Sequence, residues 1–515
     1  MIRKILTMAT VSLIFIALSC TKLDEKFKGD LPDTAAGAGV STDALLKGVY
    51  NSLQTTFQSQ DNVFALTEMT TDEMIGPTRG PDWDDNGTWR VLHAHRWDGE
   101  HVHLRDVFNR LLQTSFAATD FLRFDSTSSK ASEARFLRAF AEYMVLDGWD
   151  QVPYRLPGES TLLPSRVRSG VEELTYIISE INAVLPTLPD GPAGKANKDA
   201  ARVLLMKCYL NKGVYANRAA PTFDNADMQQ VITLANTIIG SNKYSFSANY
   251  FDNFAPNNTV IGKENIWVQE NVAGISAAAG STVNSRWHTV MHYNQNPGGW
   301  NGFTTLSDFY NKFESSDIRR GTDYHTTGGL PNPGHRINVG FLTGQQYNWT
   351  TDDSLKDRTG APLIFTPEVK LIETGKNLEV TGIRPFKFPV DYVNDGSGNV
   401  DNDYPYFRLA DVMLMKAEAL LRSNGSGALD IVNSIRTNRG ASLLTTLTLD
   451  NLLDERGREL YLESWRRSDM IRFGKFLAPF QEKNYESDPK YLLFAIPNQQ
   501  LAVNPNLKPN PGYQQ

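Results

Sequence analysis

Cysteine is almost absent from this chain of 515 residues, which has only Cys20 and Cys208. Two cysteines exclude a disulfide scaffold and a cysteine-based zinc finger. An excess of basic residues is absent too: 51 Lys and Arg against 58 Asp and Glu give a net charge of −7. An acidic chain without a basic block argues against nucleic acid as a partner. Hydrophobic residues at 41% and charged residues at 21% are typical of a folded globular protein.

Sequence motifs of the common enzyme classes are also missing. The chain has no Gly-x-Ser-x-Gly elbow, no P-loop and no dinucleotide fingerprint. His288 and His292 are four residues apart, but Thr289 stands where a zinc protease would carry its Glu. A glycosidase needs two carboxylates at a set distance in space, and no motif points to such a pair. We therefore expect a protein that is not an enzyme.

Only one long apolar run is present, and it lies at the N-terminus. Arg3 and Lys4 precede an apolar segment from Ile5 to Leu18, which is shorter than the ~20 residues that span a bilayer and fits a signal peptide over 1–19. Ala17-Leu18-Ser19-Cys20 resembles a bacterial lipobox, although the usual motif has Leu three positions before the Cys. We expect Cys20 to carry lipid and 20–40 to form a tether; cleavage by an ordinary signal peptidase is the alternative.

Apolar residues at three- and four-residue spacing predict a mainly α-helical fold. The predicted helices cover 42–57, 103–124, 131–149, 170–185, 198–215, 227–239, 406–423, 426–438 and 449–476. Between about 241 and 400, Gly, Asn, Pro, Thr and aromatic residues replace this periodicity, with short strands expected at 266–268 and 385–390. Helix pairs joined by short turns predict a tetratricopeptide-like scaffold over 41–240 and 401–480, interrupted by a loop-rich insertion.

Four segments spread over the chain resemble the SusD/RagB family, outer-membrane lipoproteins of Bacteroidota that bind nutrients, mostly glycans. They are Glu133–Phe140 with Val152-Pro153-Tyr154, Tyr406–Val412 with Lys416–Leu420, Glu455–Leu460 with Trp465–Gly474, and Ile496-Pro497 with Asn504-Pro505 and Asn510–Tyr513. Their order and spacing carry the resemblance, and the lipobox stands in the expected place. The family implies one fold over 41–515, built from four helix pairs with an irregular ligand region. It also implies a partner, a TonB-dependent transporter of the SusC type in the outer membrane.

Two loops contain the aromatic and polar side chains that a sugar site requires. Sugar C–H faces pack on aromatic rings, and sugar hydroxyls bond to carboxylates, amides and guanidinium groups. We expect the ligand-binding residues to be Asp72, Arg79, Asp82, Trp83, Asp84 and Trp89 in the first loop, and Trp287, Tyr293, Trp300 and Asn301 in the second. The alternative for any of these tryptophans is packing of the loop on the helical scaffold. Trp97, Trp267 and Trp465 are assigned to packing.

Metal sites have weaker support in the sequence. Two His-x-His pairs, His93 with His95 and His101 with His103, would share a face on a strand, but no residue nearby completes a zinc shell. Residues 394–403 place oxygen ligands at alternate positions, Asp395, Ser397, Asn399 and Asp401, without the Gly and Glu of an EF-hand loop. Calcium and an Asx-rich turn are the two readings of this segment. No cofactor is expected otherwise.

Charged residues recur in the segment Glu455–Asp469 at helical spacing. Opposite charges three or four residues apart form pairs on a helix face, so we expect a structural network there and not a catalytic site. The sequence thus predicts a lipid-anchored surface protein that binds oligosaccharides and delivers them to a SusC-type transporter. A surface glycoside hydrolase, and a transporter lid for peptide import without a glycan ligand, are the alternatives.

Overall fold

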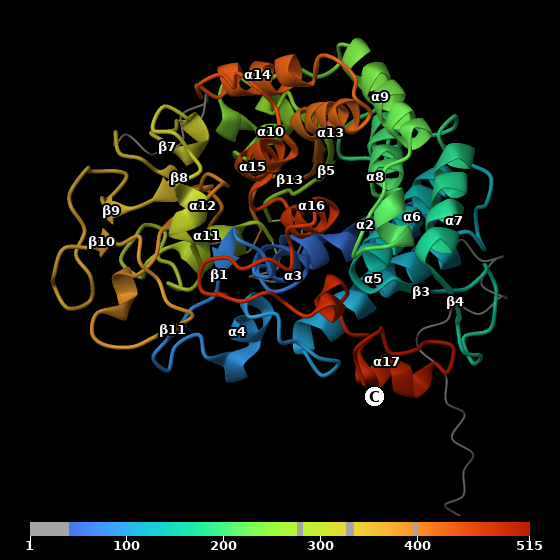
Figure 1. Ribbon diagram of the computed structural model, residues 1–515, viewed down its shortest axis with the longest axis horizontal. Helices are drawn as coiled ribbons and strands as arrows, with labels where there is room; N and C mark the ends of the chain where they lie inside the picture. The colour runs from blue at the N-terminus through green and yellow to red at the C-terminus, as the bar shows by residue number, and fades with distance from the viewer. Residues whose placement is uncertain (1–40, 275–281, 326–333, 396–398, 515) are drawn as a thin grey trace, which may run out of the picture. The chain divides into compact units, whose positions relative to one another are not determined.

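Helices that pack on their neighbours in chain order make up the right-hand part of Figure 1. This computed structural model describes residues 41–274, 282–325, 334–395 and 399–514. Each helix from α5 to α9 contacts the next, and α13 packs on α9 and on α14. The helices are α2 (Thr42–Gln58), α3 (Val63–Glu68), α4 (Thr88–His93), α5 (Val102–Phe121), α6 (Ser129–Trp149), α7 (Gly170–Val184), α8 (Lys198–Ala216), α9 (Asn225–Gly240), α10 (Asn258–Ile261), α11 (Asn284–Val290), α12 (Ser307–Tyr310), α13 (Leu409–Arg422), α14 (Ala428–Asn438), α15 (Leu449–Leu460), α16 (Arg466–Arg472) and α17 (Asn498–Val503). The prediction of a mainly helical chain is confirmed.

Local sequence explains where these helices begin. Ser128 accepts a hydrogen bond from the Lys130 amide at the start of α6, and Asn197 accepts one from Ala200 at the start of α8. Such caps bind amide groups that the first turn of a helix leaves unpaired. Helix α6 is buried on nearly every side. Its Phe140 lies 4.8 Å from the ring of Trp267 on β5, so the helical array and the strands share one core.

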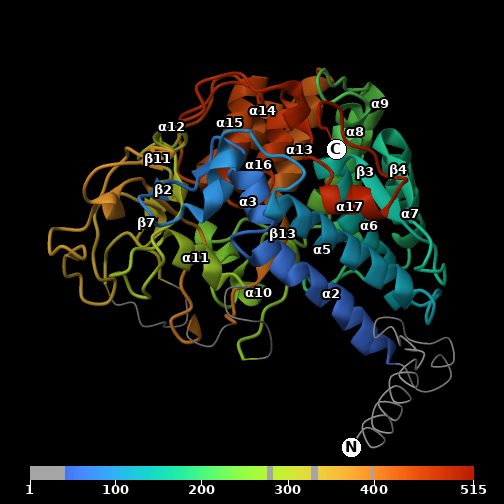
Figure 2. The same cartoon turned by 90° about the horizontal axis from the view of Figure 1, so that it is seen from below.

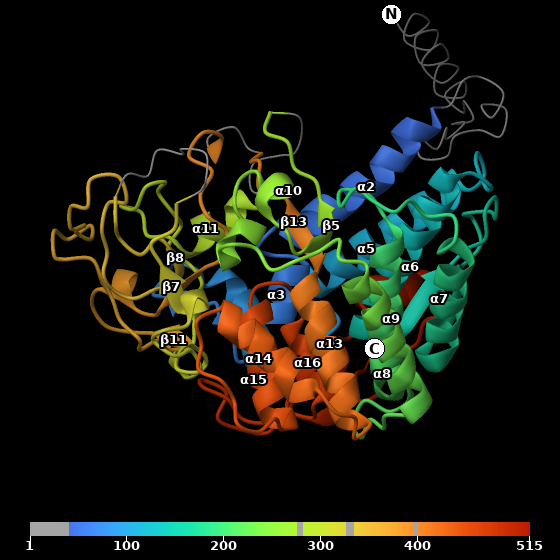
Figure 3. The ribbon, with the colours of Figure 1, turned by 90° about the horizontal axis from the view of Figure 1, so that it is seen from above.

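Strands are short and scattered, and they hold the loop-rich region in place. They are β1 (Met74–Ile75), β2 (Thr78–Arg79), β3 (Gln151–Tyr154), β4 (Arg166–Ser169), β5 (Asn265–Gln269), β6 (Thr304–Thr305), β7 (Gly321–Thr322), β8 (Val339–Leu342), β9 (Gly344–Gln345), β10 (Ile364–Phe365), β11 (Ile372–Glu373), β12 (Arg384–Phe386) and β13 (Tyr404–Arg408). Three of the seven described pairs join distant parts of the chain: β13 with β5, β1 with β6, and β11 with β2. Figures 2 and 3 show this region, which contains β7 and β11, on the opposite side of the helical part from α7 and α8.

Three sequence predictions are corrected in this region. The helix expected from 406 begins at Leu409, because Tyr404–Arg408 pairs with β5 as strand β13. The helix expected over 449–476 is two helices, α15 and α16, separated by Leu462 and Ser464, whose φ angles of 59° and 68° cannot continue a helix. The strand expected at 385–390 ends at Phe386. The strand at 266–268 is present as β5.

A fully buried network of charges connects α15 to the loop-rich region. Glu459 of α15 accepts hydrogen bonds from Arg319, Arg408 and Arg439, at 3.0, 3.1 and 2.9 Å. Arg408 also bonds Glu264, at 3.0 Å. Burial alone would raise the pKa of Glu459, but the three guanidinium groups outweigh it and lower that pKa well below its usual range. The prediction of a structural network in this segment is confirmed.

Residues from Asp43 onward form one compact unit. The predicted signal peptide, Cys20 and most of the predicted tether lie outside the described residues. Within the described part of the chain, no helix combines the length and apolarity that crossing a bilayer requires.

Candidate ligand-binding site

A two-strand ladder brings the two predicted loops together. Strand β1 of the first loop pairs antiparallel with β6, just after the second loop, with Met74 opposite Thr305 and Ile75 opposite Thr304. The Thr305 hydroxyl also donates to the carbonyl oxygen of Glu73, at 2.6 Å. The Trp83 loop therefore follows strand β1, and the Trp300 loop leads into strand β6, so the ladder brings the two loops close together.

Trp83 and Trp300 meet where these loops touch. The indole Nε1 of Trp83 donates a hydrogen bond to the carbonyl oxygen of Trp300, at 3.0 Å. The Trp83 ring packs on Phe303, with 5.0 Å between centroids. A Cβ atom at Gly302 would lie 2.4 Å from the Trp83 ring, so only glycine leaves space for the indole there. Trp83 is half-buried, and Trp300 is 39% exposed.

The imidazole ring of His288 packs against the exposed ring of Trp300. The two rings are stacked, with 5.6 Å between centroids and 22° between planes. His288 Nδ1 donates to the Gly298 carbonyl oxygen, and Nε2 lies 2.9 Å from Asp395 Oδ1. Burial lowers the pKa of His288, but the hydrogen bond and charge of Asp395 outweigh it and raise that pKa above its usual value. The sequence analysis discussed His288 only as a possible zinc ligand, so it did not predict that His288 supports Trp300.

A second group of polar side chains surrounds Tyr293. The Arg358 guanidinium lies over the Tyr293 ring, 4.0 Å from its centroid, and forms an ion pair with Glu379. Glu379 also contacts Nε2 of His292, at 2.9 Å. Burial and the nearby charge of Asp82 raise the pKa of Tyr293. Arg358 and Asp82 are exposed, and Tyr293 is half-buried, so these side chains present hydroxyl, guanidinium and carboxylate groups at the surface.

Four of the predicted ligand residues are buried, and the structure assigns them to loop support. Arg79 donates to the carbonyl oxygens of Gly302 and Thr381. Their burial leaves no surface for a ligand, which corrects the expectation for Arg79 (4% exposed), Trp89 (5%), Trp287 (1%) and Asn301 (1%). For Trp89 and Trp287 the packing alternative therefore holds.

The indoles of these two tryptophans face inward because each lies on a short helix that covers the core. Trp89 of α4 stacks on His103 with 4.7 Å between centroids, and its Nε1 donates to Asp85. Trp287 of α11 donates from Nε1 to Asp395, at 2.9 Å. Trp97 and Trp267 are also buried, at 2% and 0% exposure, as predicted.

Two predicted carboxylates are occupied by protein partners. Both oxygens of Asp72 bond the guanidinium of Arg466, at 2.7 and 2.8 Å, across 394 positions of sequence. Burial would raise the pKa of Asp72, yet Arg466 outweighs it and lowers that pKa. Asp84 forms an ion pair with Arg90, at 2.9 Å, on a more exposed surface. Asp72 thus supports the loop, whereas Asp84, next to Trp83 in the sequence, keeps 43% of its side chain exposed.

The four histidines of the two His-x-His pairs are all buried. His93 and His101 each contact a backbone carbonyl oxygen, of Gln481 and Thr88, at 3.0 Å. Burial lowers the pKa of both to about 4 and that of His95 to about 3. They lie on α4, α5 and the turn between them, so the strand geometry that would share a metal is not formed.

The acidic segment near residue 400 is folded as a network of turns. Asp391 accepts hydrogen bonds from the amides of Val393, Asn394 and Asp401, and Asp401 accepts one from Ala273. Asp395 contacts Trp287 and His288. Ser397, a proposed calcium ligand, lies outside the described residues. Of the described candidate ligands, Asp395 and Asp401 thus accept hydrogen bonds from distant segments of the protein, whereas Asp391 caps the local turn.

Two hollows lie away from the tryptophan pair. One of about 420 Å³ is lined by Tyr310, Arg320, Arg336 and Tyr347, among others. Another, of about 520 Å³, lies between the end of α8 and the C-terminal segment. Neither hollow is lined by Trp83 or Trp300.

Comparison with known proteins identifies the family. The SusD family model matches residues 235–513, more than half of the chain. The chain belongs to the SusD family. SusD family members are binding proteins and not catalysts, in agreement with the sequence prediction that this chain is not an enzyme.

Relatives of known name or structure share most of the length of this SusD family chain. It is 27% identical to the starch-binding protein SusD of Bacteroides thetaiotaomicron, with 87% of this chain and 85% of that protein covered. A laminarin-binding SusD-like protein has 18% identity and a TM-score of 0.69, over 92% of this chain and 99% of that one. Surface glycan-binding protein A of Bacteroides uniformis has 18% identity and a TM-score of 0.67, over 91% and 98%.

Proposed function

We propose that this protein captures oligosaccharides at the cell surface on the exposed face formed by Trp83, Trp300 and Tyr293. The observation that carries the proposal is the pair of tryptophans from distant loops, hydrogen-bonded to each other and only partly covered. Aromatic rings that remain partly exposed next to polar side chains suit a sugar, whose faces are apolar and whose edges carry hydroxyls. The named relatives that bind starch, laminarin or surface glycans support this ligand class.

Each side chain at this face has a distinct role in the proposal. The sugar C–H faces pack on Trp300 and Trp83. Asp82, Asp84 and Arg358 bond the hydroxyls that point sideways, and Tyr293 contributes a ring and a hydroxyl. No bond in the sugar is broken. Affinity is modest, because each sugar–protein hydrogen bond replaces one with water at small net gain.

We further propose that Cys20 carries the lipid anchor and that the captured ligand passes to a SusC-type transporter. Both parts rest on the N-terminal sequence and on family membership. Two or more acyl chains hold a protein stably on a membrane. A Cys20→Ser variant expressed in a Bacteroidota host should leave the membrane fraction. A variant that stays there would contradict lipid attachment at Cys20.

Affinity electrophoresis tests the binding proposal. Chain 21–515 is run through gels containing starch, laminarin or other polysaccharides, beside Trp83→Ala, Trp300→Ala and Phe116→Ala. Phe116 is a matched control because its aromatic side chain is 38% exposed and lies on α5, which belongs to neither loop. We expect one polysaccharide to retard the protein and the Phe116 variant, but not the two tryptophan variants.

The remaining outcomes separate the alternatives. Retardation that survives both tryptophan substitutions would keep the function and reject the site. No retardation by any polysaccharide would favour a lid that serves peptide import. Release of reducing ends from the gel polysaccharide would instead favour a glycoside hydrolase.

A further inference from the structure

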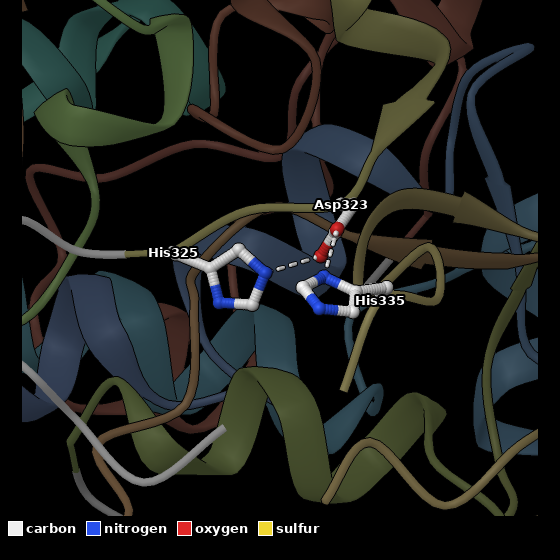
Figure 4. A group of neighbouring side chains, drawn as sticks. All are labelled: Asp323, His325 and His335. Carbon is white, nitrogen blue, oxygen red and sulfur yellow. Dashed lines mark ion pairs between the residues drawn. The ribbon is translucent and has the colours of Figure 1, made fainter. Parts of the chain in front are cut away.

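Asp323, His325 and His335 converge in the loop-rich region, apart from the residues of the candidate sugar site (Figure 4). Asp323 Oδ1 lies 2.7 Å from His325 Nε2, and Asp323 Oδ2 lies 3.5 Å from His335 Nδ1. One potential ligand atom from each residue lies within 4.8 Å of the others. No other group of three or more His, Cys, Asp or Glu side chains in the described ranges is arranged in this way.

The backbone holds Asp323 and His325 on the same side of the chain. Tyr324, between them, is buried, and its hydroxyl donates to Asp252 Oδ1 at 2.8 Å. The Tyr324 amide donates to Asn338 Oδ1, and its carbonyl oxygen accepts from Asn338 Nδ2, both at 2.9 Å. Because neighbouring side chains of an extended segment alternate, an inward Tyr324 directs Asp323 and His325 outward together.

His335 is fixed by a separate contact. Its backbone amide lies 2.9 and 3.1 Å from the two carboxylate oxygens of Asp352. His335 reaches the cluster from the far side of residues 326–334, so the three side chains come from two separately anchored stretches. The imidazoles are accessible, with His325 at 40% and His335 at 79% side-chain exposure.

One carboxylate oxygen of Asp323, Oδ1, is shielded from solvent and makes no hydrogen bond within the described structure. Its contact with His325 Nε2, at 2.7 Å, does not have hydrogen-bond geometry. A buried carboxylate oxygen without a hydrogen bond is costly, and a bound cation would satisfy it. One imidazole nitrogen lies beside each oxygen of the Asp323 carboxylate, and imidazole nitrogens are ligands for zinc, copper, nickel or cobalt in preference to calcium or magnesium.

We propose that Asp323, His325 and His335 bind one divalent transition-metal ion of the zinc class. Ligand atoms around tetrahedral zinc are about 3.3 Å apart, given bonds of about 2.0 Å. The contact of His325 with Asp323 Oδ1, at 2.7 Å, and that of His335 with Asp323 Oδ2, at 3.5 Å, lie on either side of this spacing. Three protein ligands leave a fourth position for water or an external group. The ion would also tie position 325 to position 335 and so stabilise this part of the surface.

Isothermal titration with zinc chloride tests the site, on chain 21–515 without a polyhistidine tag. We expect one zinc ion per chain and at least a tenfold loss of affinity in each of Asp323→Asn, His325→Ala and His335→Ala. Asp353→Asn is the matched control, because Asp353 is an exposed carboxylate in the same region that does not belong to the cluster. Cobalt(II) should give a visible absorption band of tetrahedral coordination, which the same three variants lose.

Circular dichroism spectra of the variants serve as the control for folding, so that a loss of zinc affinity is not caused by unfolding. No saturable zinc binding would overturn the proposal. Zinc binding that survives all three substitutions would place the ion elsewhere and would also overturn it. Binding of calcium but not of zinc or cobalt would reject the assignment to a transition metal. None of these results depends on whether the protein binds a glycan.

Discussion

The indole Nε1 of Trp83 lies 3.0 Å from the carbonyl oxygen of Trp300. A hydrogen bond from one tryptophan side chain to the backbone of the other thus connects the two loops. This bond uses the edge of the Trp83 ring and the backbone of residue 300, so it does not involve the Trp300 ring, which stacks on His288. The position of one proposed sugar platform thus depends on the loop that carries the other.

Gly302→Ala should disturb this arrangement without removing either tryptophan. A methyl group would lie 2.4 Å from the Trp83 ring and push it off Phe303. We expect about a tenfold loss of glycan affinity, equal to ~1.4 kcal/mol, because the two rings would no longer be held together. Isothermal titration with the polysaccharide identified by electrophoresis measures this loss of affinity.

Gly48→Ala is the control for this variant, since a Cβ atom there meets nothing within 4 Å. Its affinity should equal that of the unchanged protein. Full affinity in the Gly302 variant would show that Trp83 does not need its observed position for binding.

Protonation of His288 should strengthen ligand binding, provided that the proposed sugar site is correct. The pKa of His288 is raised, so the charged pair with Asp395 is complete below the ordinary histidine pKa of about 6.5 and is lost as pH rises through the raised value. Because His288 supports the Trp300 ring, affinity should fall a few-fold between pH 6 and pH 8.5. Titrations in one buffer series at constant ionic strength measure the change.

His288→Gln is the matched variant for that series. Its glutamine retains hydrogen-bonding groups but carries no charge at any of these pH values, so its affinity should vary little. An equally steep pH dependence in the variant would assign the titration to another group.

Glu459→Gln should destabilise the protein strongly. The substitution keeps the side-chain size but leaves the buried Arg319, Arg408 and Arg439 with less compensating negative charge. Breaking a buried ion pair costs about 3–5 kcal/mol of unfolding free energy. Urea denaturation measures the loss. Glu368→Gln, at an exposed position, should change stability by less than ~0.5 kcal/mol. Equal stability of the two variants would mean that the network adds little.

Acid should unfold the protein through its buried carboxylates. Burial raises the pKa values of Asp411, Glu418 and Glu455, but neighbouring Lys and Arg side chains outweigh it and lower each to about 2. Their stabilisation is therefore present above the unfolded pKa of about 4 and is lost as pH falls toward 2. The melting temperature, followed by calorimetry from pH 6 to pH 2.5, should fall steeply below pH 4. A Glu418→Gln variant should show a shallower slope.

The positions of most long helices were predictable because they depend on a local pattern. The apolar spacing of 198–215 gave α8 to within a residue at either end. Contacts over long distances were not predictable. Asp72 stands in a loop rich in polar residues, and nothing near it shows that Arg466 occupies both its oxygens. The short helices α4 and α11 were also missed, so Trp89 and Trp287 were assigned to a ligand although their helices turn them inward.

The Glu459 network limits how the ligand region can be exchanged between relatives. Glu264, Arg319 and Lys387 lie in the loop-rich segment, whereas Arg408, Glu459 and Glu463 lie in the C-terminal helical part. A chimaera that replaces residues 241–400 wholesale would separate buried cations from their anions at the junction. A graft of the ligand region therefore has to keep Glu264, Arg319 and Lys387 unchanged, whereas surface positions such as Trp83 and Trp300 can be exchanged.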